Sequence, residues 1–445
     1  MPEVSSLPSI DLNRLGGAAL GVLHANRLGG FTRPAIGLYP HQWSWDSAFI
    51  AIGLRRAEPE AARSELRSLV RGQWSDGRLP QIVYTPGPDD RYQPGAEFWA
   101  SARPAGAATP SAGLIQPPVH ALAALLVADA TATANPAAAR AFERELYPAL
   151  RQWHDYLVRD RARARVLAEI VHPWESGTDS SPLWDAALER IPATPATVIT
   201  RPDLQHAGLG ERPGDREYAK FFWLAEEYRD GACRDHDGQS FRLVDPLFNT
   251  LWAVSERALA VIAERCGEDP RPHRERADAI ERALDELWTG DGFYGAFDRN
   301  TDSLIDRATC SGLIPLLLSN LPHADALRAT LLGERFLGGP MPARLVPSYD
   351  RTAGDFDSAQ YWRGPAWINM NWMLALALRP SGDATTAESL ERAILEAAAN
   401  GDPEASGAFP EYVDPLTLEA RGTRRFSWTA TLTLDVLAGG SRLPT

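Results

Sequence analysis

Residues 245–261 read DPLFNTLWAVSERALAV, and this stretch has the pattern of a single helix. The side chain of Asp245 can cap the first turn, and Pro246 is tolerated at the first helical position, where no amide hydrogen bond is lost. Apolar residues then recur at intervals of 4, 3, 4 and 3, which is the spacing of one helix face: Leu247, Leu251, Val254, Ala258 and Val261. The stretch therefore predicts a helix with one buried face.

The same helical periodicity covers most of the chain, whereas strand signals are few. Further helices are expected near 15–23, 59–74, 113–130, 142–157, 217–229, 280–287, 306–319, 323–335, 366–378, 390–397 and 427–437. Pro148 should kink or split the 142–157 helix, and Gly290 and Asn400-Gly401 can end the helices before them. Strand patterns occur at 81–84 and 197–200. Since strands and helices do not alternate and no fixed repeat is present, the sequence predicts an all-α fold.

Length and composition limit the class of protein. A chain of 445 residues could form about three average domains, but one large helical barrel can use all of it. With 44% hydrophobic and 23% charged residues, the chain resembles a globular enzyme and not a disordered protein. The net charge of −13 argues against nucleic acid or an anionic membrane as the main partner. We therefore expect one catalytic domain over 1–445 that acts on a small molecule.

The cysteines and the N-terminal segment bear on the compartment. Cys233, Cys266 and Cys310 are far apart and odd in number, so neither a disulfide framework nor a metal-binding cysteine motif is expected. This usage fits a reducing, cytoplasmic environment. The short apolar stretch 15–23 is interrupted by glycines and lacks a cleavage site, which favours a first packed helix over a signal peptide. No apolar run reaches the roughly 18 residues of a membrane span. The sequence is compatible with a homo-oligomer but does not set the oligomeric state.

Tryptophans gather in four short segments that also carry charged residues. The segments 39–46, 172–185, 361–367 and 409–428 hold seven of the fourteen tryptophans, although they make up only about a ninth of the chain. A pyranose has an apolar C–H face that packs on aromatic rings and a rim of hydroxyls that bind charged acceptors and donors. A single tryptophan of this kind usually fills a core. Four such clusters together favour a sugar-binding site.

Hydrolysis of a glycosidic bond requires two carboxyl groups, and sequence context selects the candidates. Asp179 lies in WESGTDSSP, where flanking tryptophans would raise its pKa as a general acid requires, although it could instead cap a helix. Glu175 in the same motif is the alternative general acid, but its residue context favours a structural role as a hydrogen-bond acceptor. Glu411 in FPEYVDP could polarise water or be an exposed loop acid, and Asp414 beside it fits a turn better.

Two further charged residues have an open interpretation. Asp46 in WSWD either binds sugar hydroxyls or caps the apolar helix that follows. Arg363 in YWRGP either binds substrate or orients an acid, and a structural ion pair is equally consistent with the sequence.

Other chemistries have weaker support. The chain contains neither HExxH nor GxSxG nor a phosphate-binding loop, and no metal or cofactor is expected. Asp298, Asn300, Asp302 and Asp306 resemble part of a calcium loop that lacks its glycine and its final glutamate. A sugar epimerase or isomerase would need a proton-abstracting base, and His41, His120 and His172 lie near the aromatic segments. A non-catalytic sugar-binding protein would not need both acids.

Taken in order, these segments resemble glycoside hydrolase family 63, and within it the bacterial glucosylglycerate and mannosylglycerate hydrolases. The likeness runs from about Leu38 to Leu437 and rests on YPHQWSWDSAFIAIGL, QPPVHA, WESGTDSSPLWD, AQYWRGPAW, FPEYVDP and SWTA. The resemblance implies an (α/α)6 barrel whose cavity is covered by loops or short helices. It also implies cleavage of glucosylglycerate or mannosylglycerate to hexose and glycerate with inversion at the anomeric carbon. Another small α-glucoside is the alternative substrate.

The same resemblance assigns roles to individual residues. Asp179 matches the general acid and Glu411 the general base. Sugar-binding positions are Tyr39, Trp43, Trp45, Asp46, Trp174, Gly177, Tyr361, Trp362 and Trp367. The set that holds the glycerate carboxylate is matched by Tyr92, Gln116, Arg212 and Tyr218.

Arg212 has independent physical support, because an acidic protein that binds an anion needs a local arginine and a guanidinium can hold a carboxylate with two hydrogen bonds. It also lies in the stretch 186–216, which is rich in proline and expected to be a long loop over the active site. The alternative interpretation is that Arg212 is a solvated arginine on the surface and binds no ligand. The chain departs from the family where glutamines usually precede Ser427: here the residues are Arg424, Arg425 and Phe426.

Overall fold

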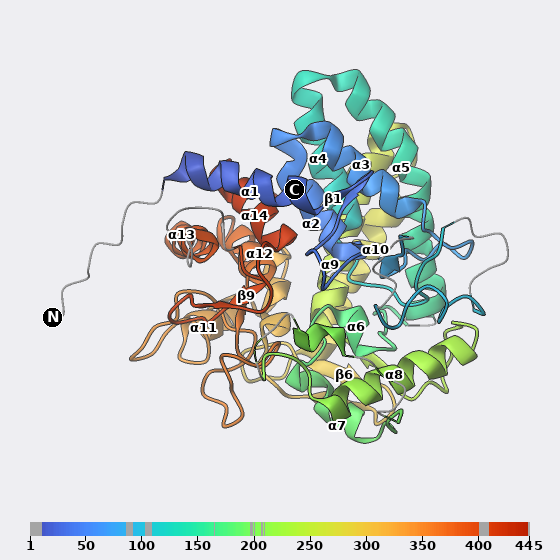
Figure 1. Ribbon diagram of the computed structural model, residues 1–445, viewed down its shortest axis with the longest axis vertical. Coiled ribbons are helices and arrows are strands. Elements are labelled where there is room, and N and C mark those ends of the chain that lie inside the picture. The colour runs from blue at the N-terminus through green and yellow to red at the C-terminus, as the bar shows by residue number, and fades with distance from the viewer. Residues whose placement is uncertain are drawn as a thin grey trace.

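The computed structural model describes residues 11–85, 92–102, 109–163, 165–195, 199, 201–205, 208, 210–399 and 409–443 (Figure 1). In the described residues the fold is mainly helical, as the sequence predicts. The α-helices are α1 (Leu12–Asn26), α2 (Ser44–Ala57), α3 (Pro59–Val70), α4 (His120–Ala134), α5 (Pro136–Tyr156), α6 (Pro173–Ser176), α7 (Asp185–Glu189), α8 (Asp215–Asp230), α9 (Pro246–Cys266), α10 (Arg271–Ala283), α11 (Ala324–Leu332), α12 (Ile368–Leu378), α13 (Ala384–Ala399) and α14 (Ser427–Leu437).

Shorter elements lie between these helices. A π-helix, η1 (Leu157–Ala162), continues α5. The 3-10 helices within the described part of the chain are η2 (Pro182–Trp184), η4 (Pro202–Gln205), η5 (Leu284–Leu287) and η6 (Cys310–Leu317). The strands pair as small antiparallel sheets: β1 (Arg27–Leu28) with β2 (Phe31–Thr32), β3 (Gln42–Trp43) with β4 (Ile82–Val83), β5 (Leu243–Val244) with β6 (Ala296–Asp298) and β7 (Ser303–Ile305), and β8 (Ala366–Trp367) with β9 (Tyr412–Val413) and β10 (Ala420–Arg421).

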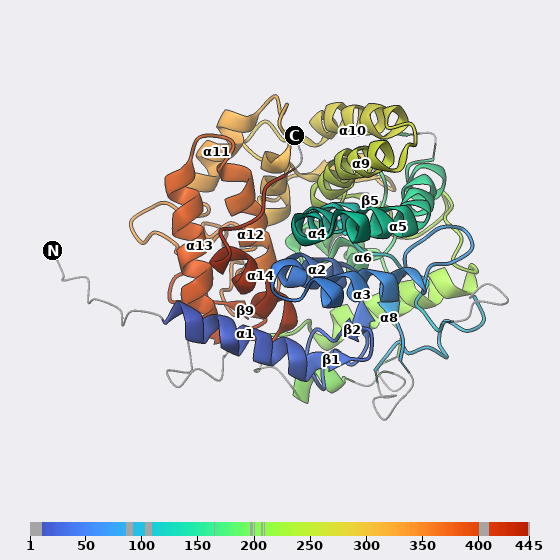
Figure 2. The ribbon, with the colours of Figure 1, turned by 90° about the horizontal axis from the view of Figure 1, so that it is seen from above.

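The packing of the helices forms two layers around one core. In the inner layer, α2 packs on α4, α4 on α9, α9 on η6, η6 on α12, α12 on α14, and α14 back on α2, which closes a ring. Each inner element also has an outer partner: α1 covers α14, α3 covers α2, α5 covers α4, α10 covers α9, α11 covers η6 and α13 covers α12. Figure 2 shows these outer helices around the periphery of the inner ones.

Burial explains which helices are inside. Every residue of α12 is buried, and α2 is buried from Ser44 to Arg55, so these helices present apolar surface on all sides. The outer helix α13 instead buries one stripe, which includes Leu390 and Ile394. A helix that is buried on all sides lies inside the fold, whereas an amphipathic helix faces solvent on its polar side. Burial on all sides thus distinguishes α2 and α12 of the inner layer from α13 of the outer layer.

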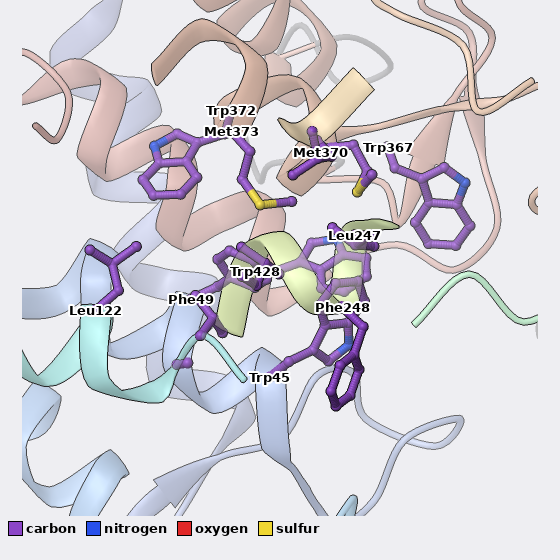
Figure 3. Close-up of a cluster of buried hydrophobic side chains, with 14 of the residues drawn as sticks. Trp45, Phe49, Leu122, Leu247, Phe248, Trp367, Met370, Trp372, Met373 and Trp428 are labelled. Atoms are coloured by element: carbon purple, nitrogen blue, oxygen red, sulfur yellow. The ribbon is translucent and has the colours of Figure 1, made fainter. Parts of the chain in front are cut away.

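The helix predicted at 245–261 is confirmed as α9. Asp245 caps α9 by accepting hydrogen bonds from the backbone amides of Leu247 and Phe248, at 3.2 and 3.3 Å. Gly267, in the left-handed conformation at φ +83°, ends the helix. Figure 3 shows Leu247 and Phe248 of α9 in a cluster of buried hydrophobic side chains that also includes Trp45 and Trp428.

Three expectations about helix continuity are wrong at least in part. Of the kink or split expected at Pro148, the split does not occur, because α5 runs without a break from Pro136 to Tyr156. The 306–319 stretch forms a 3-10 helix, η6, which contains Pro315, a residue without an amide hydrogen to donate to an α-helical ladder. The expected helix at 280–287 is the end of α10 followed by the 3-10 helix η5, so Gly290 lies beyond it.

Other expected boundaries differ by a few residues. The helix expected at 113–130 begins only at His120, because Pro117 and Pro118 precede it and disfavour helical backbone. The strand expected at 81–84 is confirmed as β4. Of the strand expected at 197–200, only Ile199 is described, and it is not in a strand. The helix stop expected at Asn400-Gly401 lies outside the described residues.

The stretch 186–216 is not loop throughout its described part. Its first residues belong to α7, the 3-10 helix η4 lies within it, and its last residues begin α8. Among the described helices, none combines the length and the hydropathy that crossing a bilayer requires.

Candidate active site

One cavity lies where the first turns of inner helices α2, α12 and α14 meet. It is lined by Tyr39, Trp43, Trp45, Asp46, Gln81, Tyr92, Gln116, Trp174, Gly177, Asp179, Tyr361, Trp362, Trp367, Glu411, Phe426 and Trp428. Both candidate carboxyl groups, Asp179 and Glu411, therefore face the same cavity although 232 residues separate them in the sequence. All nine expected sugar-binding residues line it as well.

Aromatic rings from several elements build the walls. The indoles of Trp362 and Trp367 stack in parallel, with centroids 3.9 Å apart and an interplanar angle of 1°. Trp45 of α2 meets Trp428 of α14 edge to face, with centroids 5.5 Å apart. Figure 3 shows Trp45, Trp367 and Trp428 converging from three separate segments of the chain. Flat apolar surfaces of this kind are what the C–H face of a pyranose packs against.

Asp179 follows a short helix that ends in a sharp turn. The ring of His172 caps α6 by accepting from the amide of Trp174, and Gly177 ends α6 in the left-handed conformation at φ +73°. Burial raises the pKa of Asp179 to about 7; the Arg212 guanidinium opposes this, and the nearby carboxylates Glu217 and Glu411 add to it. A carboxyl group with a pKa in this range can hold a proton near neutral pH and donate it.

Glu411 is held by donors from three segments. Its Oε1 accepts a 2.7 Å hydrogen bond from the hydroxyl of Tyr39. Its Oε2 accepts from Nη2 of Arg212 at 2.7 Å and from the backbone amide of Thr423 at 3.2 Å. The carboxylate is only 1% exposed, so its place at the cavity wall is fixed by these contacts. The arrangement suits a group that positions a water molecule and takes its proton.

Asp46 belongs to the cavity and does not cap a helix. The helix α2 already begins at Ser44, with Trp43 in the N-cap position and no side-chain cap, so Asp46 lies within the first turn. Burial raises the pKa of Asp46 well above its usual range, and the carboxylates of Glu411 and Asp179 raise it further. The N-cap alternative for Asp46 is therefore wrong.

The two rival carboxylates have structural roles. Glu175 is fully buried and pairs with Arg161 through two contacts of 2.5 and 2.6 Å, and it also accepts from the amides of Ile115 and Val171. Asp414 accepts from the amides of Leu416 and Thr417 in a turn. Neither residue lines the cavity, whereas Asp46, Asp179 and Glu411 do, and Asp179 and Glu411 stay the candidate catalytic pair.

The residues expected to hold an aglycone carboxylate fall into two groups. Tyr92 and Gln116 line the cavity, and Gln116 also accepts from the amide of Trp45 at 3.2 Å. Arg212 and Tyr218 do not line it: Arg212 is buried behind Glu411, and the hydroxyl of Tyr218 donates to the carbonyl of Gln93 at 3.4 Å. The alternative of Arg212 as a solvated surface arginine is wrong, because only 6% of the residue is exposed.

Arg363 is placed differently from the other expected substrate-binding residues. Its guanidinium makes two 2.8 Å hydrogen bonds to the carboxylate of Asp185, and a third contact joins it to Asp355 at 3.3 Å. Arg363 is not among the residues that line the cavity. The structure thus favours the ion-pair alternative that the sequence left open.

The histidines offer no proton-abstracting base to the cavity. His120 is bonded to the hydroxyl of Ser44 and His172 to the carbonyl of Phe221, and burial lowers the pKa of each ring to about 3. His41 lies behind Trp43, with the two rings stacked 6.2 Å apart. None of the three is among the residues that line the cavity, which removes the specific support for an isomerase.

The partial calcium motif belongs to a β-hairpin. Asp298 ends β6 and Ser303 begins β7, and the carboxylate of Asp298 pairs with Arg190 and accepts from the amide of Asn300. Among the described residues, no three histidine, cysteine or acidic side chains are grouped closely enough to hold a metal ion.

Sequence reasoning missed three residues of the cavity wall: Gln81, Phe426 and Trp428. Gln81 precedes β4, which pairs with β3 and so brings it beside the first turn of α2. Trp428 was visible as part of the aromatic segment 409–428. Phe426 occupies the place where the family resemblance predicted a polar residue, and its ring packs against Tyr39 and Trp428.

A mainly helical protein whose aromatic cavity is lined by three carboxyl groups, Asp46, Asp179 and Glu411, has the parts of a glycoside hydrolase. The family described as "Mannosylglycerate hydrolase MGH1-like glycoside hydrolase domain" matches residues 39–429, and the chain belongs to this family. A mannosylglycerate hydrolase from Rubrobacter radiotolerans is 38% identical over 94% of this chain and 96% of its own length. A glucosylglycerate hydrolase from Mycolicibacterium hassiacum is 35% identical over 97% and 99% of the two chains.

Solved structures agree with this assignment. The mannosylglycerate hydrolase of glycoside hydrolase family 63 from Thermus thermophilus, in complex with Tris, aligns with a TM-score of 0.85 and 36% identity over 94% of this chain and 99% of that one. Its complexes with Tris and D-glycerate and with glucose give TM-scores of 0.82 and 0.81. The predicted membership of family 63 is confirmed.

Proposed function

We propose that this chain hydrolyses the α-glycosidic bond of mannosylglycerate or glucosylglycerate and releases hexose and glycerate with inversion at the anomeric carbon. In this proposal Asp179 protonates the glycosidic oxygen while Glu411 takes a proton from the water that attacks the opposite face of the sugar. The observation that carries the proposal is the convergence of these two carboxyl groups on one cavity walled by indole rings. Inversion requires about 6.5–9.5 Å between the carboxyl groups, which leaves room for the water.

The substrate class is supported by the relatives. Enzymes that match nearly the whole chain are named as hydrolases of mannosylglycerate and of glucosylglycerate, so both hexoses are candidates. The related Thermus thermophilus structures hold D-glycerate in one case and glucose in another, which are the two products of such a reaction. Tyr92 and Gln116 line the cavity, and Arg212 lies beside it to receive the anionic aglycone.

The proposed architecture is an (α/α)6 barrel that forms one catalytic domain over residues 1–445. The closed ring of inner elements, each with its outer partner, supports it, with η6 in the place of one inner helix. The segment 186–216 contributes Arg212 next to Glu411, which supports a covering role for that segment. Cys233, Cys266 and Cys310 are free thiols, which supports a reducing, cytoplasmic location.

The proposed reaction can be tested directly with defined substrates. The purified protein is incubated with α-mannosylglycerate, α-glucosylglycerate and neutral α-disaccharides, and the products are followed by NMR from the first minutes. We expect hexose and glycerate from at least one glycerate glycoside, with the β-anomer of the hexose formed first. Initial formation of the α-anomer would contradict inversion. Cleavage of neutral disaccharides alone would contradict the glycerate aglycone.

A further inference from the structure

The ring of His172 joins backbone groups from two different helices. Its Nδ1 accepts a 3.0 Å hydrogen bond from the amide of Trp174 in the first turn of α6, and its Nε2 lies 2.8 Å from the carbonyl oxygen of Phe221 in α8. A backbone amide only donates and a carbonyl only accepts, so the two partners together require the neutral tautomer with its hydrogen on Nε2. Burial lowers the pKa of this ring to about 3, which agrees with the neutral form.

The segment that begins at His172 carries the candidate acid. Trp174, Gly177 and Asp179 all line the cavity. The turn that leads to Asp179 is held from within, because Oγ of Ser176 accepts from the amide of Thr178 at 2.9 Å. The direction in which this turn points therefore depends on how α6 is attached to its surroundings.

The helix α8 is the element to which α6 is attached through His172. This helix carries Tyr218 and follows Arg212, two residues that the family resemblance assigns to the aglycone. The indole of Trp174 also packs against α8, with ring centroids 5.8 Å from Phe221 and 6.3 Å from Phe222. The oxygen that the acid must protonate joins the hexose to the aglycone. The placement of α6 against α8 thus decides whether the acid reaches that oxygen.

Histidine suits this place better than the usual capping residues. Serine, threonine, aspartate and asparagine are the common N-caps, but none has a second polar atom that extends far enough to reach α8 as well. An aspartate would also add a second buried carboxylate to this short helix, which already holds the fully buried Glu175. The imidazole binds both backbone groups without introducing a charge.

We propose that His172 is a positioning residue for Asp179: it fixes the turn of the candidate acid to α8, so that the carboxyl group faces the glycosidic oxygen. His172 does not touch the substrate in this proposal, because it is not among the residues that line the cavity and both ring nitrogens are bound to backbone groups. The inference rests on the proposed function, in which Asp179 is the general acid.

The leaving group distinguishes a positioning role from a role in folding alone. A glycerate glycoside needs a proton from Asp179, whereas a glycosyl fluoride does not. A variant that misplaces only the acid should lose rate on the glycoside and keep it on the fluoride. A variant that merely unfolds part of the protein should lose rate on both substrates in equal proportion, because fewer active sites are present.

Two substitutions remove one hydrogen bond each. In His172→Asn the amide oxygen can replace Nδ1 as the cap of α6, but the side chain is too short to reach Phe221. In His172→Gln the amide nitrogen can replace Nε2 as the donor to Phe221, but the amide of Trp174 loses its acceptor. We expect both variants to lower kcat on a glycerate glycoside by about a hundredfold, the effect of a displacement of about 1 Å near the reacting groups. Both should keep most of their rate on α-glucosyl or α-mannosyl fluoride.

Asn135→Ala provides the matched control. Asn135 caps α5 by accepting from the amide of Ala138 at 3.0 Å, is exposed and does not line the cavity. The variant therefore loses a cap of the same kind away from the candidate acid. Its rates on the glycoside and on the fluoride should both equal those of the natural sequence.

The kinetic outcomes decide the inference. A selective loss on the glycoside in the two His172 variants supports it. An equal loss on both substrates, no loss at all, or the same selective loss in Asn135→Ala overturns it. If the natural sequence cleaves only neutral α-disaccharides, the glycerate aglycone of the proposed function is wrong, and the comparison of disaccharide with fluoride still decides the role of His172.

A measurement on the natural sequence tests the same inference without any substitution in the protein that is measured. NMR of protein labelled with ¹⁵N at histidine reports which ring nitrogens carry a hydrogen, and the His172 signals are those that disappear in its variants. We expect a hydrogen on Nε2 and none on Nδ1 throughout the pH range in which the enzyme is active. A hydrogen on Nδ1 in that range would overturn the inference, because the ring could not then accept from Trp174.

Discussion

Gly177 lies against the indole ring of Trp45, so closely that a Cβ atom on the glycine would stand 2.6 Å from Cη2 and Cζ2 of the ring. The two residues come from segments far apart in the sequence. Trp45 belongs to the first turn of α2, and Gly177 is the left-handed residue that directs the chain from α6 towards Asp179. The contact thus links one wall of the cavity to the segment that carries the candidate acid.

Substitution of Gly177 by alanine should disturb that link. The added methyl group must displace either Trp45 or the turn before Asp179, and a displacement of about 1 Å near the reacting groups can lower the rate by about a hundredfold. We expect Gly177→Ala to lower kcat/KM on a glycerate glycoside by that amount, as measured by release of hexose.

Gly382 provides the control for this experiment. It also has a left-handed conformation, at φ +86°, but a Cβ there would meet no atom within 4 Å. Gly382→Ala should therefore carry only the backbone cost of about 1 kcal/mol in the free energy of unfolding, with kcat/KM unchanged. Equal kinetic losses in the two variants would show that the contact with Trp45 has no part in catalysis.

The roles of the two carboxyl groups can be separated by the choice of leaving group. On a glycerate glycoside, Asp179→Asn and Glu411→Gln should each lower kcat by about 10²–10⁴-fold, because each removes one proton transfer. On a glycosyl fluoride, whose leaving group needs no proton, Asp179→Asn should keep most of its rate and Glu411→Gln should not.

Glu419→Gln serves as the control for loss of a carboxylate, because Glu419 is exposed and its ion pair among the described residues is with Arg421 of the same hairpin. It should retain normal rates on both substrates. If Asp179→Asn loses as much activity on the fluoride as on the glycoside, Asp179 is not the general acid.

The pH dependence of the rate follows from the raised pKa of Asp179. Because Asp179 must be protonated to act as an acid and burial raises its pKa to about 7, kcat/KM should fall on the alkaline side of about pH 7. The alkaline limb should disappear when a glycosyl fluoride replaces the glycoside. A profile that stays level to pH 9 on the glycoside would exclude Asp179 as the proton donor.

The same raised pKa predicts an effect on stability. The folded protein binds the Asp179 proton more tightly than the unfolded chain does, because the pKa rises from 3.8 to about 7. Its contribution to the stability of the fold is therefore complete below pH 3.8 and is lost progressively as the pH rises to about 7.

Asp179→Asn, which is neutral at every pH, should then be more stable than the natural sequence at pH 8, by at most about 4 kcal/mol in the free energy of unfolding. The difference should vanish near pH 4. Thermal unfolding at both values measures it, and a destabilised variant at pH 8 would contradict the argument.

Glu175 should matter for folding and not for the chemical step. Glu175→Gln leaves the guanidinium of Arg161 with Asp235 as its remaining acidic partner, at 3.1 Å. Removal of one partner from a buried ion pair costs about 3–5 kcal/mol in the free energy of unfolding when the other charge is left unpaired, and Asp235 should keep the loss below that range. Denaturant unfolding should show this loss, whereas the exposed Glu419→Gln should change stability by less than about 0.5 kcal/mol.

Much of this protein could be predicted from local sequence. The helix at 245–261 was predictable because apolar spacing and an N-cap act within a few residues. The aromatic segments indicated a sugar site, because tryptophans next to acidic residues can be recognised directly in the amino-acid sequence. The motifs WESGTDSSP and FPEYVDP already distinguished Asp179 and Glu411 from the other acids, with the help of the family resemblance.

Tertiary structure decided what each charged group contacts. Of the two roles that the sequence left open for Asp46, the helix cap is excluded because α2 already begins at Ser44. Glu175 pairs with Arg161, and Arg363 pairs with Asp185. Arg212, read from the sequence as a ligand for an aglycone, instead lies bound to Glu411, 199 residues further along the chain. Partners such as these are chosen by the packing of distant segments, because a salt bridge or a raised pKa depends on distance and burial, and neither quantity is encoded in local spacing.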